Sequence, residues 1–191
     1  MQTKPNLLPS NIIIGTLGPE YSFHDIVRRK NLINNPFYLL DDFTTLFNSL
    51  EAGDIQAGLV ATYNTIHGFV GLNSELIKRF DLDLVAEYKL EINLHLAAGS
   101  QISIDDIHYV YAHPVAWNQC SNFFKSKNIK WLESFSNAQA LKDLQKGQLI
   151  NSAAISGSDA IQHYGLNTIV KNIQNEVENI TTFALVKNKY V

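Results

Sequence analysis

The sequence predicts a two-lobed α/β protein with an inter-lobe cleft. Short apolar runs alternate with helix-like segments along the 191 residues, which is typical of βαβ units with parallel strands. A longer alternating run near the middle predicts a strand that crosses between the lobes, and a last strand near the C-terminus crosses back. We expect residues 1–93 with 178–191 in lobe 1 and residues 94–177 in lobe 2, each boundary holding to within about 6 residues. Small ligands usually bind in a cleft of this kind.

The N-terminal part of the chain predicts alternating strands and helices. Asn11–Gly15 is a short apolar run ending in glycine, so it is expected to be a buried strand. A helix should follow at 22–32, with basic residues in its last turn where they suit the helix dipole. Asp41 or Asp42 is expected to cap a second helix, which Gly53 ends. The other strands expected here are 36–40 and 56–62, the second apolar on both faces.

Residues 84–98 carry the clearest pattern. Tyr88, Leu90, Ile92 and Leu94 alternate with polar residues, and this period of two predicts one long, half-buried strand. Strands and helices then alternate again. The expected strands are 108–112, 129–135, 152–156, 168–170 and 182–186, and the expected helices are 115–126, 137–147 and 158–164.

Composition limits the classes of function. The formal net charge of −3 leaves no basic excess for a phosphate backbone, so nucleic acid is not an expected partner. Cys120 is the single cysteine, which excludes an internal disulfide and fits a reducing compartment. Because no signal-like segment and no run of about 18 apolar residues is present, we expect a cytoplasmic protein without membrane partners. The histidines show no metal-ligand spacing and the glycines no dinucleotide fingerprint, so neither a metal nor a cofactor is expected.

Five motifs follow one another along the chain. Residues 15–23 read Gly-Thr-Leu-Gly-Pro-Glu-Tyr-Ser-Phe, and residues 61–68 read Ala-Thr-Tyr-Asn-Thr-Ile-His-Gly. Residues 112–120 read Ala-His-Pro-Val-Ala-Trp-Asn-Gln-Cys. Ala-Ala-Ile is followed by Tyr-Gly-Leu within 153–166, and residues 179–183 read Asn-Ile-Thr-Thr-Phe.

In order and spacing these motifs resemble those of the prephenate dehydratase family. The family patterns are Gly-x-x-Gly-Pro-x-Gly-Thr-Phe-Ser, Pro-Ile-Glu-Asn-Ser-x-x-Gly, Ser-His-Pro-x-Ala-x-x-Gln-Cys, Ala-Ala-Ile with Tyr-Gly-Leu, and Asn-x-Thr-Arg-Phe. This chain departs from them by a similar residue at Ser22 for threonine and Thr65 for serine. The larger departures are Tyr21 for glycine, His24 for serine, Tyr63 for glutamate, Ala112 for serine and Thr182 for arginine.

The resemblance implies a fold similar to type II periplasmic binding proteins, with the active site between the lobes. It implies a lyase that removes water and carbon dioxide from prephenate, a small carboxylate, to give phenylpyruvate on the route to phenylalanine. The chain stops at Val191, eight residues past Phe183, so the regulatory domain of many family members is not expected. A homodimer is expected by analogy.

The resemblance also implies site residues. Thr181 occupies the catalytic threonine position, where its hydroxyl would donate a hydrogen bond to the departing oxygen. Thr182, in place of arginine, loses a charge-assisted bond worth about 1–2 kcal/mol. Helix N-termini after Gly18-Pro19 and at Asn64-Thr65 are expected to help hold the carboxylates, whereas Arg28, Arg29 and Lys30 lie too far along their helix. The expected substrate-binding residues are Ser22, Asn64, Thr65, Gln119, Thr182 and Phe183.

Other interpretations of the same residues stay open. Thr181 and Thr182 suit an ordinary strand, and Asn64 suits a turn in the left-handed region. Gln119 would serve equally in a bond to backbone, and His113-Pro114 as a strand-to-helix junction. For the whole chain, the alternatives are an enzyme that decarboxylates prephenate without aromatising it and a small-anion-binding module that has lost catalysis.

Overall fold

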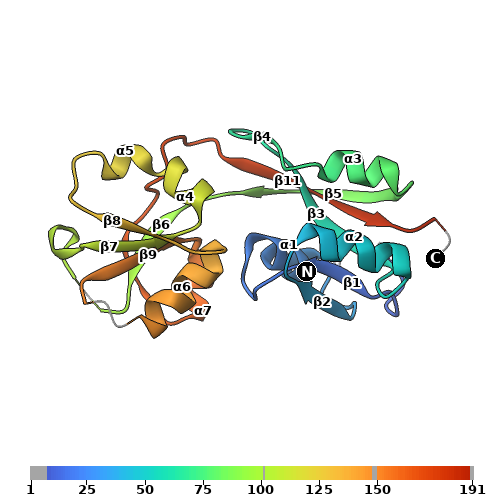
Figure 1. Ribbon diagram of the computed structural model, residues 1–191. Coiled ribbons are helices and arrows are strands. Elements are labelled where there is room, and N and C mark those ends of the chain that lie inside the picture. Colours follow the sequence, from blue (N-terminus) through green and yellow to red (C-terminus); the bar gives the residue numbers. More distant parts are fainter. Residues whose placement is uncertain (1–7, 101, 148–149, 190–191) are drawn as a thin grey trace, which may run out of the picture. The chain divides into compact units, whose positions relative to one another are not determined.

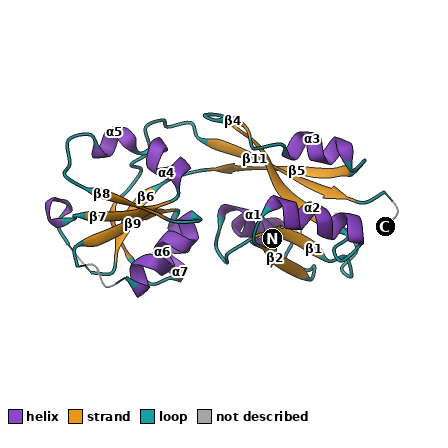
Figure 2. Cartoon of the chain, viewed as in Figure 1, coloured by secondary structure: helices purple, strands orange, loops and turns teal. Residues whose placement is uncertain are grey.

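The computed structural model of the chain describes residues 8–100, 102–147 and 150–189. The chain divides into two compact units, the first running to Glu91 and resuming at Ile180, the second spanning Ile92–Asn179. Each unit has its own sheet with helices packed on it (Figure 1; Figure 2). This mixed α/β, two-sheet architecture confirms the predicted fold class.

The sheet of the first unit is mixed. The strands follow the order β2-β1-β3-β11-β5, with the short β4 beside β3. β1 runs parallel to β2 and β3, whereas β11 runs antiparallel to β3 and β5. The elements are β1 (Ile14–Leu17), α1 (Phe23–Asn31), β2 (Phe37–Leu40), α2 (Phe43–Ala52), β3 (Ala57–Asn64), β4 (Gly68–Phe69), α3 (Asn73–Arg79), β5 (Asp83–Glu91) and β11 (Ile180–Lys187).

Both faces of this sheet carry an apolar core. We call them the α1 face and the α2 face, after a helix that packs on each. Side chains buried on the α1 face include Val27, Leu59, Ala61, Phe183 and Leu185. Those on the α2 face include Leu46, Phe47, Leu50, Val60, Ala184 and Val186. Each fully buried side chain of this size contributes about 1.5–3 kcal/mol.

The helix caps follow from single residues. Asp42 caps α2 by accepting a hydrogen bond from the Thr45 N–H at 2.7 Å, and Gly53 ends the helix with a left-handed φ of 81°. Ser22 caps α1 by accepting from the Asp25 N–H at 3.2 Å. The predicted start and end of α2 are thereby confirmed.

The second unit holds a five-stranded sheet in the order β10-β6-β9-β7-β8. β7 runs parallel to β8 and β9, while β6 runs antiparallel to β9 and β10. The elements are β6 (His95–Ala98), the 3₁₀ helix η1 (Ile104–Asp106), β7 (Tyr109–Ala112), α4 (Pro114–Gln119), α5 (Ser121–Phe124), β8 (Lys130–Glu133), α6 (Asn137–Lys146), β9 (Ser152–Ser156), α7 (Ser158–His163) and β10 (Asn167–Val170).

The single strand predicted at 84–98 is wrong, because the structure has two strands there. β5 ends at Glu91, which pairs with Ile180, the first residue of β11. Beyond that point the backbone bonds to a loop instead of a strand: the Ile92 N–H donates to the Asn179 carbonyl and the Leu94 N–H to the Gln174 side chain. Residues that alternate like a strand therefore carry the chain from one unit to the other.

The single helix predicted at 115–126 is also wrong, because it breaks at Cys120 into α4 and α5. In a continuous helix the Asn122 N–H would donate to the Asn118 carbonyl. Here the side chain of Asn175 takes both groups, accepting from the Asn122 N–H at 3.0 Å and donating to the Asn118 carbonyl at 3.2 Å. A distant amide thus replaces one bond of the helical ladder.

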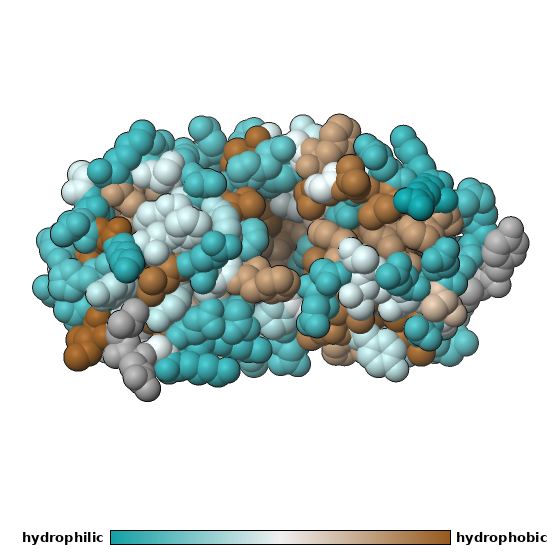
Figure 3. Space-filling view, in the orientation of Figure 1, coloured by the Kyte–Doolittle hydropathy of each residue, from teal (hydrophilic) through white to brown (hydrophobic). Residues whose placement is uncertain are grey.

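Three further elements were not predicted, namely α3, β4 and η1. The first strand begins three residues later than expected, at Ile14. Only some neighbouring strands are parallel, so the βαβ expectation holds for part of each sheet. Apolar side chains also reach the surface, including Phe69, Leu72 and Val115, and brown atoms lie among the polar ones in Figure 3.

Candidate active site

Asn64 and Thr181 lie directly across from each other on β3 and β11. The Asn64 side chain donates from Nδ2 to the Thr181 hydroxyl oxygen at 3.0 Å, and both residues are buried. Among the described residues, the Thr181 hydroxyl donates to no acceptor of its own. The amide therefore orients the hydroxyl and leaves its proton available to a ligand oxygen.

Turn geometry holds Asn64 rigid. Its Oδ1 accepts from the backbone N–H groups of Ile66 and His67, at 3.0 and 3.1 Å. The predicted helix N-terminus at Asn64-Thr65 is wrong, because this side chain stabilises the turn into β4. The left-handed conformation considered for Asn64 is not adopted either, since its φ is not positive. Thr65 joins the same turn to β11 by accepting from the Ile180 N–H at 3.0 Å.

A β-bulge decides which face Asn64 occupies. The register between β11 and β3 shifts so that Phe183 pairs with Ala61, and Thr182 pairs with Tyr63, which leaves Thr62 as an extra residue. Regular alternation would place Asn64, three residues from Ala61, on the opposite face. The extra residue brings Asn64 to the α1 face, beside Thr181.

Neighbouring threonines on β11 point to opposite faces. Phe183 is part of the α1-face core and Ala184 of the α2-face core. β11 pairs with β5 without a register shift over these residues, so Thr181 shares the face of Phe183 and Thr182 shares that of Ala184. The structure thus brings Asn64, Thr181 and Phe183 together and directs Thr182 away from them.

The pair sits where ligands commonly bind to α/β sheets. Asn64 is the last residue of β3, and β1, parallel to β3, ends at the same edge with Leu17. In open α/β sheets, ligands bind outside the carboxyl ends of the parallel strands. Thr181 and Asn64 therefore face the edge of the sheet that this rule indicates.

Ser22 has a structural role at this edge. Its hydroxyl accepts from the Asp25 N–H and donates to the Leu17 carbonyl at 2.8 Å, so it fixes the start of α1 against the end of β1. The hydroxyl's only proton is used in that second bond. Ser22 can meet a ligand only through its remaining acceptor capacity.

The arginines of α1 bond to a carboxylate in the first turn of their own helix. Arg28 and Arg29 both bond to the buried carboxylate of Asp25, at 2.7 and 2.6 Å. Arg29 also lies over the ring of Tyr21, 4.2 Å from its centroid. Burial raises the pKa of Asp25, but bonds from Arg29, the Tyr21 N–H and Arg28 outweigh it, so the pKa lies below 3.8. Asp25 thus binds both arginines, and Arg29 also pairs with Glu20 at 3.6 Å.

His24 was not among the predicted site residues. It follows the cap of α1, and its Nε2 accepts from the Ala61 N–H at 3.1 Å. Its ring meets Phe183 of the α1-face core edge-on, with centroids 5.0 Å apart, and also Phe43, which packs against the α2-face core. His24 therefore lies at the edge of the sheet, next to a neighbour of Thr181. Only the departure from the family's serine at position 24 marked it in the sequence.

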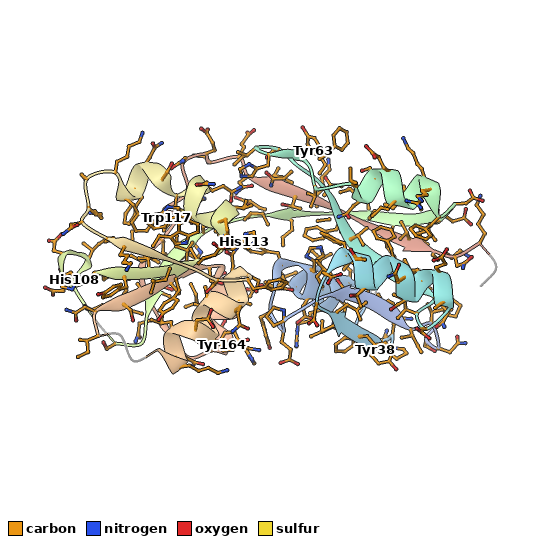
Figure 4. The ribbon with its side chains drawn as sticks, in the orientation of Figure 1. Tyr38, Tyr63, His108, His113, Trp117 and Tyr164 are labelled. Carbon is orange, nitrogen blue, oxygen red and sulfur yellow. The ribbon has the colours of Figure 1, made fainter. Side chains whose placement is uncertain are left out.

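Gln119 belongs to the second unit, at the end of α4. Its carbonyl accepts from the Asn175 N–H at 2.6 Å, while its buried side-chain amide has no hydrogen-bond partner among the described residues. His113 caps the start of α4 through a bond from the Val115 N–H, as expected of a strand-to-helix junction (Figure 4). Burial lowers the pKa of His113. Gln119 remains a predicted ligand-binding residue.

Cys120 is fully buried, and burial raises the pKa of its thiol to about 12. At neutral pH it therefore stays protonated and is a poor nucleophile. Within the described ranges, no three His, Cys, Asp or Glu side chains are grouped to hold a metal ion. No helix in the part of the chain that the structure describes is long and apolar enough to cross a membrane.

Comparison with known proteins decides the family. A model of the family described as prephenate dehydratase matches residues 14–190. The chain belongs to the prephenate dehydratase family. The resemblance carried by the five motifs is thereby confirmed.

Relatives in this family carry more than one activity. The chain is 29% identical over 181 residues to the bifunctional chorismate mutase/prephenate dehydratase of Buchnera aphidicola subsp. Schizaphis graminum, covering 92% of this chain and 47% of that protein. It is also 29% identical over 176 residues to arogenate dehydratase/prephenate dehydratase 2 of Arabidopsis thaliana, covering 92% and 46%. The chain thus spans about half the length of these relatives.

Solved structures show the same fold. The prephenate dehydratase of Staphylococcus aureus superposes with a TM-score of 0.79 at 23% identity, covering 93% of this chain and 67% of that one. The methionine-binding protein MetQ superposes with a TM-score of 0.52 at 16% identity, covering 95% and 84%. A dehydratase fold similar to substrate-binding proteins is therefore shared, as predicted.

Proposed function

We propose that this prephenate dehydratase family member is a lyase that converts prephenate into phenylpyruvate. The observation that carries the proposal is the Thr181 hydroxyl, oriented by Asn64 and with its proton unused within the described residues. Family membership supplies the reaction class. No cofactor is required, because formation of the aromatic ring drives the reaction.

Thr181 acts on the leaving group. As the carboxylate on the ring carbon leaves as carbon dioxide, its bonding electrons enter the ring and expel the hydroxyl on the opposite ring carbon. A proton acquired by this hydroxide completes water. The Thr181 O–H donates a hydrogen bond to the departing oxygen while negative charge grows on it, which is transition-state stabilisation by a preoriented donor.

The other predicted residues position Thr181, stabilise the fold around it or are expected to bind the substrate. Asn64 holds the Thr181 hydroxyl, and Thr65 secures the turn that holds Asn64. Phe183 forms the apolar floor beside Thr181, and Ser22 fixes the start of α1. Gln119 remains a predicted substrate-binding residue. Thr182, predicted as another from the sequence, lies on the opposite face of β11 from Thr181. The substrate would be a small carboxylate, and the expected homodimer and cytoplasmic location stay predictions.

The test is to incubate purified protein with prephenate and, separately, with arogenate, and to follow phenylpyruvate or phenylalanine. The Thr181→Val variant keeps the side-chain shape and removes the hydroxyl. We expect its kcat to fall by about 10²–10³, the usual effect of losing one such donor. No product above the spontaneous background with wild-type protein would reject the proposal.

The matched control is Thr182→Val, the same change on the opposite face. We expect it to alter kcat by less than about threefold, because Thr182 points to the face of β11 opposite Thr181. A loss as large as that of Thr181→Val would mean that Thr182 works in the site, as the sequence predicts, and that the face assignment is not decisive.

A second candidate is an enzyme that decarboxylates prephenate without aromatising it. It is favoured by the neutral residues Tyr63 and Thr182 at two positions that are charged in the family patterns. Consumption of prephenate without an aromatic product would support it. Ligand-induced stabilisation with no turnover would instead support a binding module that has lost catalysis.

A further inference from the structure

His24 is held from several directions. Its Nε2 accepts from the Ala61 N–H at 3.1 Å. Its ring meets Phe43 and Phe183 edge-on, at centroid distances of 5.6 and 5.0 Å. One hydrogen bond and two ring contacts fix the plane of the imidazole, and with it the direction in which the second nitrogen points.

The second nitrogen, Nδ1, carries the ring proton. Because Nε2 is an acceptor, the neutral imidazole must keep its hydrogen on Nδ1. Burial lowers the pKa of His24 to about 4, so this neutral form dominates at pH 7. No described residue accepts a hydrogen bond from Nδ1. His24 thus presents an oriented donor that the fold itself does not use.

The donor lies near Phe183, a residue that shares a face of β11 with Thr181. His24 contacts Phe183, and Thr181 is two residues away from Phe183 on the same face of β11. Two unused donors, the His24 Nδ1–H and the Thr181 O–H, therefore lie on either side of Phe183 at this edge of the sheet. A ligand at this edge of the sheet would meet both.

A carboxylate is the ligand group that lacks a donor here. Thr182, at the position of the family's arginine, faces away from Thr181, and the α1 arginines are bound to Asp25. Prephenate carries two carboxylates and one ring hydroxyl, and the proposed function gives the hydroxyl to Thr181. An N–H donor to a charged oxygen makes a stronger bond than one between neutral groups.

We infer that the Nδ1–H of His24 binds a carboxylate oxygen of the substrate at the edge of the sheet beside Thr181. This inference rests on the proposed function and deepens it. His24 is a binding residue in this account and takes no part in proton transfer. Its neutral ring donates one bond of fixed direction where the family pattern has a shorter serine.

Substitutions separate binding from structure. His24→Phe keeps a ring between Phe43 and Phe183 and removes both nitrogens, and we expect KM for prephenate to rise about tenfold with kcat nearly unchanged. His24→Gln offers an amide acceptor to the Ala61 N–H and an amide donor, and it should recover most of the affinity. Equal KM values in wild type and both variants would overturn the inference.

His95 provides the matched control. It is a buried histidine of the second unit whose Nδ1 accepts from the Asn172 N–H at 2.9 Å, so its structural bond is of the same kind. His95→Phe should lower Tm and leave KM within about twofold. A rise in KM equal to that of His24→Phe would show that the effect is structural and would count against the inference.

A direct measurement does not depend on turnover. Protein labelled with ¹⁵N-histidine, carrying Thr181→Val to slow the reaction, would be titrated with prephenate, and His24 assigned by comparison with His24→Gln. We expect the Nδ1 proton to move downfield and to exchange more slowly with water once prephenate binds. If prephenate binds and this resonance stays unchanged, the His24 inference fails alone.

Failure of the proposed function has a different signature. Wild-type protein would then form no product from prephenate, and calorimetry would detect no binding. Both the proposed function and the role of His24 would be refuted. Binding without turnover, accompanied by the expected Nδ1 change, would support the inference and remove only the catalytic part of the proposal.

Discussion

A single hydrogen bond from Asn64 orients the Thr181 hydroxyl. Both residues were predicted from the sequence, because each occupies a polar position in a motif that matches a family pattern. Their side-chain bond depends on strand pairing between positions 117 residues apart and on the extra residue at Thr62. His24 was missed as a site residue for a similar reason, since the three groups that orient it, Ala61, Phe43 and Phe183, are distant in the chain.

The half-buried imidazole of His24 predicts a pH-dependent stability. Its folded pKa is about 4, below the ordinary 6.5, so the unfolded chain binds the extra proton first. The contribution is therefore fully present above pH 6.5 and is lost as pH falls towards 4, up to about 3 kcal/mol. Urea unfolding at pH 7 and 4.5 should show a smaller loss in His24→Gln than in wild type.

Other histidines contribute to the same slope, because burial also lowers the pKa of His95 and His113. The comparison with His24→Gln isolates the part that His24 supplies. An identical pH dependence in His24→Gln and wild type would show that the pKa of His24 is not lowered in the folded protein.

Tyr88 provides a second residue-scale prediction. Its hydroxyl is sealed from solvent and has no hydrogen-bond partner among the described residues, and burial raises its pKa. An unsatisfied buried hydroxyl costs about 1–3 kcal/mol. We expect Tyr88→Phe to raise the free energy of unfolding by about 1 kcal/mol, measured by urea titration. A destabilised variant would indicate that the hydroxyl is hydrogen-bonded in solution.

At the scale of elements, the parts predicted well are those with local causes. The limits of α2 follow from Asp42 and Gly53, which act within one turn of their helix ends. The strand at 84–98 and the helix at 115–126 were predicted as continuous because their breaks are caused by Asn179 and Asn175, more than 50 residues away. Alternation and periodicity record which side chains are buried, and they do not record where a backbone changes partner.

The pairing of β3 with β11 gives the departures at Tyr63 and Thr182 a common explanation. These residues lie directly opposite each other, on the α2 face, at the positions where the family patterns have glutamate and arginine. Opposite charges paired across two antiparallel strands stabilise by about 0.2–1 kcal/mol. The two replacements therefore remove both members of one potential ion pair, and a single surviving charge would lack its partner.

We expect a double-mutant cycle to detect this coupling. Tyr63→Glu and Thr182→Arg together should be more stable than the sum of the single changes by about 0.5–1 kcal/mol in low salt. Equilibrium unfolding of the four proteins measures it, and high salt should reduce it. If the effects were additive, the arginine introduced at position 182 would not pair with the glutamate introduced at position 63, and it could instead bind a substrate carboxylate, as expected from the sequence.

At the scale of the whole molecule, the two units differ in chain continuity. The second is one segment, Ile92–Asn179, while the first needs β11, which returns to it after the second unit is complete. β11 lies between β3 and β5 and pairs with both along its length. Without it, the sheet order would be interrupted and two strand edges would lose their partner.

This asymmetry predicts the behaviour of the fragments. Residues 92–179 expressed alone should fold, because their five strands and the helices on them are all present. Residues 1–91 alone should be unfolded or aggregate, since unpaired edges of β3 and β5 would be exposed beside the apolar residues of both faces. Amide dispersion in ¹H–¹⁵N spectra distinguishes these outcomes.

A well-dispersed spectrum from residues 1–91 would mean that β11 is dispensable to the first sheet. Contacts other than the pairing of β11 with β3 would then have to position Thr181. A strand that is not needed for the sheet to fold would pair too weakly to keep the Thr181 hydroxyl in place beside Asn64 during catalysis.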